Sequence, residues 1–210
     1  MIKTYVVGGD VHYVNFIDDV EIVDDLKDAQ LVVFTGGSDV TPSFYGCKKH
    51  SKTYNDIDRD KEERSIFEEI DPKKQVCYGS CRGSQFLCVM NGGKLIQDVD
   101  NHATGYTHEI TDGEKVYMIT STHHQMQYPF DLNNKDYNIL FTSYGCESDY
   151  YDGDQIDGNK VVGNEPEIVL YHKKNLPKCL AVQGHPEMIP DSPVAEMINE
   201  LIKNLINDCK

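Results

Sequence analysis

Three short apolar runs, each followed by glycine, constrain the fold most strongly. They cover residues 5–7, 31–34 and 75–78. Runs of this length bounded by glycine are typical of buried strands. Between the last two, residues 58–70 begin with acidic side chains and then place apolar side chains at helical spacing, which predicts a helix. Because a strand, a helix and a strand in succession favour a parallel sheet, the sequence predicts an α/β protein.

Two further helices and four further strands are predicted in the rest of the chain. A helix is predicted directly after Cys81, ending near Gly92, and an amphipathic helix over residues 194–206. Neither an internal repeat nor a Pro/Ser-rich linker interrupts the 210 residues, so a single domain over residues 1–210 is predicted. Further strands are predicted over residues 115–120, 137–142, 167–171 and 179–183.

Charge and hydropathy exclude two classes of partner. The net charge of −15 repels nucleic-acid phosphates, and the largest basic cluster is Lys48-Lys49 with Lys52. No apolar run approaches the roughly 18 residues of a membrane span. The acidic runs indicate solvated carboxylates, so no metal is assigned to them. We therefore expect neither a nucleic-acid partner nor a membrane.

The seven cysteines are odd in number and irregular in spacing, in a chain without a leader peptide at its start. This pattern predicts a reducing compartment and a cytoplasmic location. Cys77 and Cys81 form C-x3-C, but no second pair at ligand spacing accompanies them, so no zinc site is expected from the cysteines. Six are interpreted as non-catalytic: Cys47, Cys77, Cys88, Cys146, Cys179 and Cys209.

The seventh, Cys81, lies in a G-x-C-x-G motif with Gly79 and Gly83, between a predicted strand and a predicted helix. A nucleophile elbow needs small neighbours at such a tight turn, and the helix N-terminus beneath the cysteine favours the thiolate. A buried structural cysteine in a glycine-rich turn is the alternative, which the pentapeptide alone does not exclude.

A cysteine nucleophile needs a base, and the base needs an orienting group. His185 and Glu187 follow a predicted strand, and Pro186 between them restricts the backbone so that both side chains are held in a fixed relation. A lone histidine is more often an ordinary surface or core residue. The acid two residues away favours a base and its orienting carboxylate.

These motifs resemble the class I glutamine amidotransferases and the related gamma-glutamyl hydrolases of the peptidase C26 type, which combine G-x-C-x-G-x-Q with a late H-P-E. Residues 34–46 look like the oxyanion-strand segment of that family, and residues 120–125 look like a substrate-side loop. The closest likeness is to the gamma-glutamyl-gamma-aminobutyrate hydrolases. It rests on Gly36-Gly37-x-Asp39-Val40-x-Pro42, Tyr45-Gly46, Arg59-Asp60, Cys81-Arg82-Gly83 and His123-His124-Gln125.

The resemblance implies a flavodoxin-like three-layer α/β/α fold with a mostly parallel central sheet. It also implies a triad of Cys81, His185 and Glu187, and an oxyanion hole made by the backbone N–H groups of Gly37 and Arg82. No cofactor is implied.

The implied substrate is a small gamma-glutamyl molecule. Gln85 would bind its glutamyl end, with an ordinary helix-surface glutamine as the alternative. His123, His124 and Gln125 would position it, although adjacent histidines can also form a metal patch or a solvated loop.

Two positions depart from the family pattern. Gly184 stands where a bulky aromatic usually precedes the histidine, which bears on the packing around His185, and Thr35 replaces a proline before Gly36. The acidic segment 147–157 is long enough to cover a site or contact a partner, and a solvated loop is the simpler interpretation.

Three functions remain open at this point. The first is a stand-alone hydrolase that releases glutamate from a gamma-glutamyl amide. The second is a glutaminase that supplies ammonia to a separate synthetase or ligase, since the chain carries no P-loop signature. The third is a non-catalytic member of the fold, against which the intact Cys81, His185 and Glu187 argue.

Overall fold

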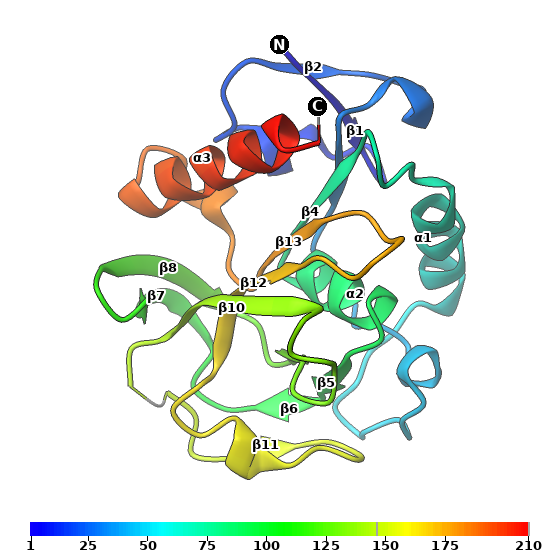
Figure 1. Cartoon of the computed structure of the whole chain (residues 1–210). Coiled ribbons are helices and arrows are strands. Elements are labelled where there is room, and N and C mark those ends of the chain that lie inside the picture. Colours follow the sequence, from blue (N-terminus) through cyan, green and yellow to red (C-terminus); the bar gives the residue numbers. More distant parts are fainter. Residues whose placement is uncertain (146, 210) are drawn as a thin grey trace.

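A mixed β-sheet forms the centre of the protein (Figure 1). The computed structural model describes residues 1–145 and 147–209, and within them nine strands form this sheet in the order β2-β1-β3-β4-β13-β12-β10-β7-β8. Their bounds are Ile2–Val6 (β1), Val20–Ile22 (β2), Leu31–Phe34 (β3), Val76–Ser80 (β4), Ala103–Thr111 (β7), Val116–Thr122 (β8), Tyr137–Ser143 (β10), Pro166–Tyr171 (β12) and Cys179–Val182 (β13).

The sheet has a parallel half and an antiparallel half. Strands β2, β1, β3, β4 and β13 pair in parallel. Strands β12, β10, β7 and β8 extend the sheet in antiparallel fashion from β13. The α/β class is therefore confirmed, with a parallel core. The antiparallel extension is larger than a mostly parallel sheet implies, and its strand β7 was not predicted.

The long helices begin where capping side chains satisfy their free N–H groups. The side chain of Asp56 accepts hydrogen bonds from the backbone of Asp58 and Arg59 at the start of α1, which covers Ile57–Glu69. Ser192 caps α3 (Pro193–Asn207) in the same way. Helix α2 (Arg82–Met90) instead begins directly at Cys81, without a side-chain cap. All three helices lie where the sequence predicts them.

Alternate residues of the central strands face two hydrophobic cores, because successive side chains in a strand point to opposite faces. Leu31 and Val33 of β3 pack in the core that includes the apolar face of α3. Val32 and Phe34 pack in the core that includes side chains of α1 and α2. Figure 1 accordingly shows α3 and α1 on opposite sides of these strands. The carboxyl ends of β3, β4 and β13 meet between the two cores.

Short elements complete the lower part of the molecule in Figure 1. Strand β5 pairs with β9 and β6 pairs with β11, around a third core that includes Ile96 and Met126. The bounds are Lys94–Ile96 (β5), Asp98–Val99 (β6), Met126–Tyr128 (β9) and Tyr151–Asp152 (β11), and the 3-10 helices are Val11–Val14 (η1), Leu26–Asp28 (η2), Pro42–Tyr45 (η3), Gly158–Lys160 (η4) and Pro186–Met188 (η5).

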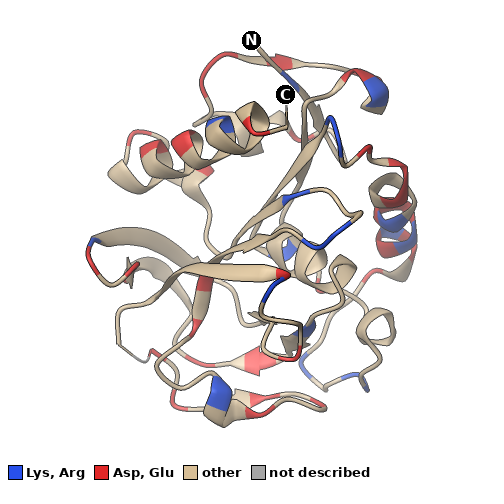
Figure 2. Cartoon of the chain, viewed as in Figure 1, with Lys and Arg blue, Asp and Glu red and all other residues tan. Residues whose placement is uncertain are grey.

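Charged residues are spread over the helices and the connections between elements. Figure 2 shows Asp and Glu interspersed with Lys and Arg along α1, with further acidic residues in the connections. The acidic segment 147–157 contains β11, so part of it is paired rather than free loop. In the described part of the chain, every helix is too short or too polar to cross a bilayer.

Candidate active site

Cys81 occupies the sharp turn between β4 and α2, as the G-x-C-x-G motif predicts. Its backbone has φ 51° and ψ −113°, in a region that residues with a side chain rarely adopt. Its N–H group donates to the carbonyl of Val182 at 2.9 Å, which ties the turn to the end of β13. The strain is therefore held in place by the sheet and leaves the thiol at the helix N-terminus, where positive partial charge favours the thiolate.

The turn closes only because its flanking residues are glycines. A Cβ atom at Gly79 would lie 2.6 Å from the carbonyl carbon of Gly83, and one at Gly83 would overlap the carbonyl oxygen of Phe34. Helix α2 thus packs backbone against backbone on β3 and β4. The motif identified in the sequence has a direct steric cause.

His185 and Glu187 lie together at the carboxyl end of β13. Nδ1 of His185 lies 2.6 Å from Oε1 of Glu187, and both residues are buried. The hydroxyl of Ser80 donates to the same carboxylate at 3.2 Å, and the backbone N–H of His185 donates to Thr120 Oγ1 at 2.6 Å. Because the carboxylate accepts from Nδ1, the other ring nitrogen is left for a second partner.

The thiol of Cys81 acts on this ring, as the pKa of His185 indicates. Burial by itself would lower the pKa of His185, but hydrogen bonds to Cys81 and to Glu187 outweigh it and raise the pKa to about 10. His185 therefore keeps its proton to a higher pH than a free histidine does. The structure thus brings together the three residues that the sequence singled out for nucleophilic chemistry.

Tyr13, from η1, is a neighbour of this group that the sequence analysis missed. Its ring centroid lies 6.1 Å from that of His185. Burial raises the pKa of Tyr13, and the nearby Glu187 and Cys81 raise it further. The tyrosine hydroxyl therefore stays protonated next to the site. Nothing in the local sequence of residues 11–14 marks it, because only the tertiary fold brings η1 to this edge.

The two departures from the family pattern have structural reasons. A Cβ atom at Gly184 would lie 2.6 Å from Cγ1 of Ile119 and 2.7 Å from the carbonyl oxygen of Thr120, so strand β8 occupies the space of a larger side chain. Thr35 accepts hydrogen bonds from the guanidinium of Arg59 through its carbonyl oxygen, at 3.1 Å, and through its hydroxyl, at 3.2 Å. Both changes are accommodated by local packing.

A cavity of about 200 Å³ opens beside Cys81. Every residue predicted to bind substrate lines it: Gly37, Arg82, Gln85, His123, His124 and Gln125. Four further residues that the sequence did not single out as substrate-binding also line it: Ser38, Asp39, Tyr54 and Thr122.

Gln85 and His123 are fixed by one carbonyl group. Nε2 of Gln85 donates to the carbonyl oxygen of Gln125 at 2.9 Å, and Nδ1 of His123 lies 3.0 Å from the same oxygen. Gln85 is only 2% exposed, so it is not an ordinary helix-surface glutamine. Burial, together with nearby His102, lowers the pKa of His123 to about 3 and keeps it neutral.

His124 differs from His123 because it lies at the rim of the cavity. Its Nε2 lies 3.2 Å from Oδ1 of Asp39, and this hydrogen bond raises the pKa of His124 despite partial burial. Asp98 faces the opposite ring nitrogen at 3.8 Å, and Lys52 pairs with Asp98. His124 therefore retains a positive charge to a higher pH than a free histidine.

The side chain of Arg82 is committed to ion pairs. Its guanidinium pairs with Asp60 and Glu63, and its Nε donates to the carbonyl of Ser38 at 3.1 Å. The side chain is 1% exposed. What Arg82 can offer a substrate is consequently its backbone N–H, as the resemblance implies, while Asp60 serves to hold this arginine.

Most of the other cysteines are buried without an activating partner. Burial raises the pKa of Cys47 and Cys77, and raises that of Cys88 to about 12. Such thiols stay protonated and unreactive. The interpretation of Cys146 as non-catalytic concerns a residue outside the described ranges.

Parts of this sequence are similar to known proteins. The profile of the Peptidase C26 family matches residues 7–135. The glutamine amidotransferase-like protein YvdE of Lactococcus lactis subsp. lactis is 30% identical over 116 residues, covering 45% of this chain and 49% of that protein. The chain thus spans about half the length of this curated relative.

Solved structures share the fold. A protein assigned to GMP synthase from Thermoplasma acidophilum has a TM-score of 0.61 at 16% identity, covering 100% of this chain and 94% of that one. The glutaminase domain of Trypanosoma brucei CTPS, solved with bound acivicin, has a TM-score of 0.56 at 11% identity, covering 99% and 94%. With more than half of its length matched by the family profile, the chain belongs to the Peptidase C26 family, a family of glutamine amidotransferase-like proteins.

Proposed function

We propose that this protein hydrolyses a gamma-glutamyl amide through Cys81, His185 and Glu187, with a thioester intermediate. The observation that carries the proposal is the position of His185, which is hydrogen-bonded to Glu187 and has its pKa raised by both Cys81 and Glu187. The family membership agrees with an enzyme of this kind. The substrate is L-glutamine or another small gamma-glutamyl amine.

In the first step the Cys81 thiolate attacks the amide carbonyl carbon, and the carbonyl electron pair moves to the oxygen. Backbone N–H groups of Gly37 and Arg82, which both line the cavity beside Cys81, donate to this oxyanion. When the tetrahedral intermediate collapses, His185 gives its proton to the departing amine. His185 then takes a proton from water, which attacks the thioester and releases glutamate and the free thiol.

The cavity provides groups for the glutamyl end. Its volume of about 200 Å³ suits a small amide rather than a large ligand. His124 supplies positive charge for the α-carboxylate, and Oε1 of Gln125 is a buried acceptor without a donor among the described residues. An α-ammonium group would satisfy that acceptor, while Gln85 and His123 hold the loop that presents it.

The experiment is glutamate release from L-glutamine and a panel of gamma-glutamyl amides, comparing the protein with its Cys81→Ala variant. Turnover that requires Cys81 supports the proposal, and turnover of an amide other than glutamine supports the stand-alone hydrolase. A thiol-directed glutamine analogue should label Cys81 in the native protein. If neither turnover nor labelling occurs, the chain is a non-catalytic member of its family.

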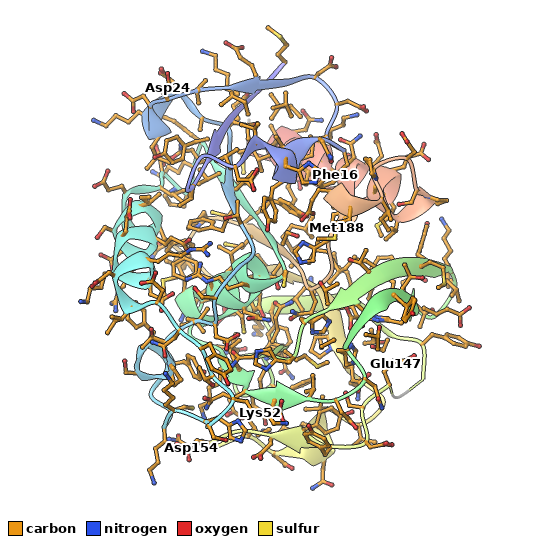
Figure 3. The ribbon with its side chains drawn as sticks, turned by 180° about the vertical axis from the view of Figure 1, so that it is seen from behind. Phe16, Asp24, Lys52, Glu147, Asp154 and Met188 are labelled. Atoms are coloured by element: carbon orange, nitrogen blue, oxygen red, sulfur yellow. The ribbon has the colours of Figure 1, made fainter. Side chains whose placement is uncertain are left out.

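A glutaminase that feeds a separate synthetase or ligase is the second candidate. Exposed apolar side chains lie on the β7–β8 hairpin and on η5, a surface suited to a protein partner. Met188, which follows Glu187 and is 56% exposed, lies beside α3 in Figure 3. Labelling of Cys81 with no turnover by the isolated protein would favour this candidate. The exposed apolar side chains on the β7–β8 hairpin and η5 are those of Tyr106, Val116, Met118 and Met188.

The remaining parts of the proposal follow from the same resemblance and composition. The flavodoxin-like three-layer arrangement and the single domain over residues 1–210 stay predictions. So do the reducing cytoplasm and a reaction that needs no cofactor at Cys81.

A further inference from the structure

A second cluster of reactive side chains lies behind the cavity wall and takes no part in the chemistry proposed for Cys81. It contains three histidines and one glutamate: His102, His108, His123 and Glu167. His102 and Glu167 are fully buried, and His123 and His108 are 3% and 8% exposed. The four come from the segment before β7, from β7, from the loop after β8 and from β12. A buried group of this composition requires a physical explanation.

The donor atoms converge on one point. Oε1 of Glu167 lies 3.2 Å from Nε2 of His108, 3.5 Å from Nδ1 of His102 and 3.9 Å from Nε2 of His123. One ligand atom each from His102, His123 and Glu167 lies within 4.8 Å of the others. Ligands about 2.1 Å from a tetrahedral zinc ion are about 3.4 Å apart, so small movements would bring these atoms to coordination distance.

A carbonyl group outside the cluster orients the ring of His123, and a carboxylate outside it lies beside the ring of His102. Nδ1 of His123 lies 3.0 Å from the carbonyl oxygen of Gln125, which can only accept, so this nitrogen carries the proton. The unprotonated Nε2 of His123 then faces the carboxylate of Glu167, so two hydrogen-bond acceptors lie opposite each other with no donor between them. On the far side of His102, Nε2 lies 3.4 Å from Oε2 of Glu165. Outer acceptors that orient an imidazole in this way are characteristic of metal-binding histidines.

Hydrogen bonds satisfy only part of the cluster: Ser143 Oγ donates to Oε1 of Glu167 at 3.2 Å, and other polar atoms have no such partner in the described part of the chain. Within residues 1–145 and 147–209, neither ring nitrogen of His102 or His108 makes a hydrogen bond of good geometry, and neither does Nε2 of His123. Oε2 of Glu167 also makes no hydrogen bond among the described residues. A protonated His108 paired with Glu167 would satisfy only part of this group. A cation between the rings and the carboxylate would satisfy all of the inward-facing atoms at once.

We propose that His102, His123 and Glu167 bind a divalent transition-metal ion of the Zn²⁺ type, with His108 as an adjoining fourth donor. Neutral imidazoles and a carboxylate form a donor set that Zn²⁺ prefers. The ion would join the β7–β8 hairpin to β12 and fix the loop that carries His123, His124 and Gln125. Its role is to hold one wall of the cavity, and it takes no part in the reaction at Cys81. The adjacent histidines alone did not predict this site, because three of its members are distant in sequence.

The test is a Zn²⁺ titration of untagged full-length protein in the Cys81→Ala background, in competition with a chromophoric chelator. This background removes the reactive thiol as an alternative ligand and makes the result independent of catalysis. We expect one ion per chain with a Kd below about 1 μM. The variants His102→Ala and Glu167→Gln should each weaken binding at least about tenfold. The matched control, His12→Ala, removes an exposed histidine of η1 that is not a member of the cluster, and it should leave binding unchanged.

A second readout does not depend on whether the variants fold. Zn²⁺ should raise the melting temperature of the Cys81→Ala protein, since a ligand that binds only the folded state stabilises it. Bound Co²⁺ should give visible absorption that Zn²⁺ displaces. Failure of the Cys81→Ala protein to bind Zn²⁺ or Co²⁺ would overturn the proposal, as would binding that His102→Ala and Glu167→Gln leave unchanged.

Discussion

Nδ1 of His185 lies 2.6 Å from Oε1 of Glu187, although only Pro186 separates the two residues in sequence. Neighbouring side chains in an extended strand point to opposite faces, and residues two apart share a face. Strand β13 has already ended at Val182, and the proline begins η5, whose 3-10 turn brings the two side chains together. The carboxylate is held from its other side by Ser80, which fixes the ring before any substrate binds.

The first prediction concerns the pH dependence of stability. The folded-state pKa of His185 is raised from 6.5 to about 10. The protonated ring therefore stabilises the folded protein, fully so below about pH 6.5, and this contribution is lost as the pH rises through about 10. The free energy of unfolding should therefore decline across this window. Urea unfolding at several pH values measures it, and NMR of the ring reports the pKa directly. In Cys81→Ala the decline should be smaller. A His185 ring that titrates near pH 6.5 in the native protein would contradict the interaction of His185 with Cys81 and Glu187.

Replacing Cys81 should separate activity from stability. Both Cys81→Ala and Cys81→Gly should lose glutamate release by at least about a thousandfold, because no nucleophile remains. The two should differ in stability, because the backbone at φ 51° is strained for alanine and not for glycine. We expect Cys81→Gly to be more stable than Cys81→Ala by about 1 kcal/mol. This difference already allows for the greater entropy of glycine in the unfolded chain, which opposes it. Equal stability in urea unfolding would show that the turn is relaxed.

The glycine at the helix side of the elbow should be indispensable for folding. A Cβ atom at Gly83 would overlap the carbonyl oxygen of Phe34, and backbone cannot rotate away as a side chain can. Gly83→Ala should destabilise the protein by about 3 kcal/mol or more. Gly158→Ala is the matched control, because its nearest contact would be 3.6 Å, and it should change stability by less than about 0.5 kcal/mol. Thermal unfolding of both variants checks this, and similar melting temperatures would refute it.

Four strands of the parallel half, β1, β3, β4 and β13, and the elbow could be predicted from the sequence because their signals are local, whereas β2 was not predicted. Glycine directly after an apolar run marks where a strand ends, and G-x-C-x-G marks a turn that sterics allow only for glycine. H-P-E likewise lies within three residues. These segments appear in the structure at the predicted places, within a few residues of the predicted bounds.

What could not be predicted depends on contacts between distant segments. Strand β7 contains residues 103–111, whose polar and exposed side chains give no clear strand pattern, and it forms because β8 and β10 pair with it. Tyr13 reaches His185 only through the fold. The same holds for Asp39, which faces His124 from 85 positions away in the chain. Sequence periodicity reports on local burial and carries no such information.

The contact between Asp39 and His124 leads to a prediction about substrate binding. Asp39 raises the pKa of His124. Asp98 also faces the His124 ring, and Lys52 forms an ion pair with Asp98. Asp39→Asn keeps an acceptor for the N–H of Tyr54 but removes the charge, so the pKa of His124 should fall. At pH 7.5 the KM for a gamma-glutamyl amide should then rise about tenfold, while kcat changes less than about twofold.

Steady-state kinetics at pH 6 and pH 7.5 provides the measurement. The increase in KM should be smaller at pH 6, where His124 regains its proton in the variant. Asp24→Asn, a change of the same charge away from the cavity, serves as the control. Equal KM values for Asp39→Asn and the native protein at pH 7.5 would exclude His124 as the carboxylate-binding group.

The final prediction separates the two parts of Arg82. Its guanidinium is buried between Asp60 and Glu63, whereas its backbone N–H lies at the start of α2 beside Cys81. Arg82→Ala leaves Asp60 without its ion-pair partner and leaves Glu63 paired with Arg59 alone, so it should destabilise the protein by about 3–5 kcal/mol. Because the N–H remains, protein that stays folded at low temperature should keep its kcat within about threefold of the native value.

Arg64→Ala is the matched control for this change, since Arg64 forms an exposed pair with Glu68 on the same helix as Asp60 and Glu63. Its loss should cost less than about 1 kcal/mol. Urea unfolding and glutamate release, both measured at low temperature, distinguish the roles. If Arg82→Ala were as stable as Arg64→Ala, the buried pairs would contribute little. If it remained folded and lost kcat by orders of magnitude, the guanidinium itself would have to contact the substrate.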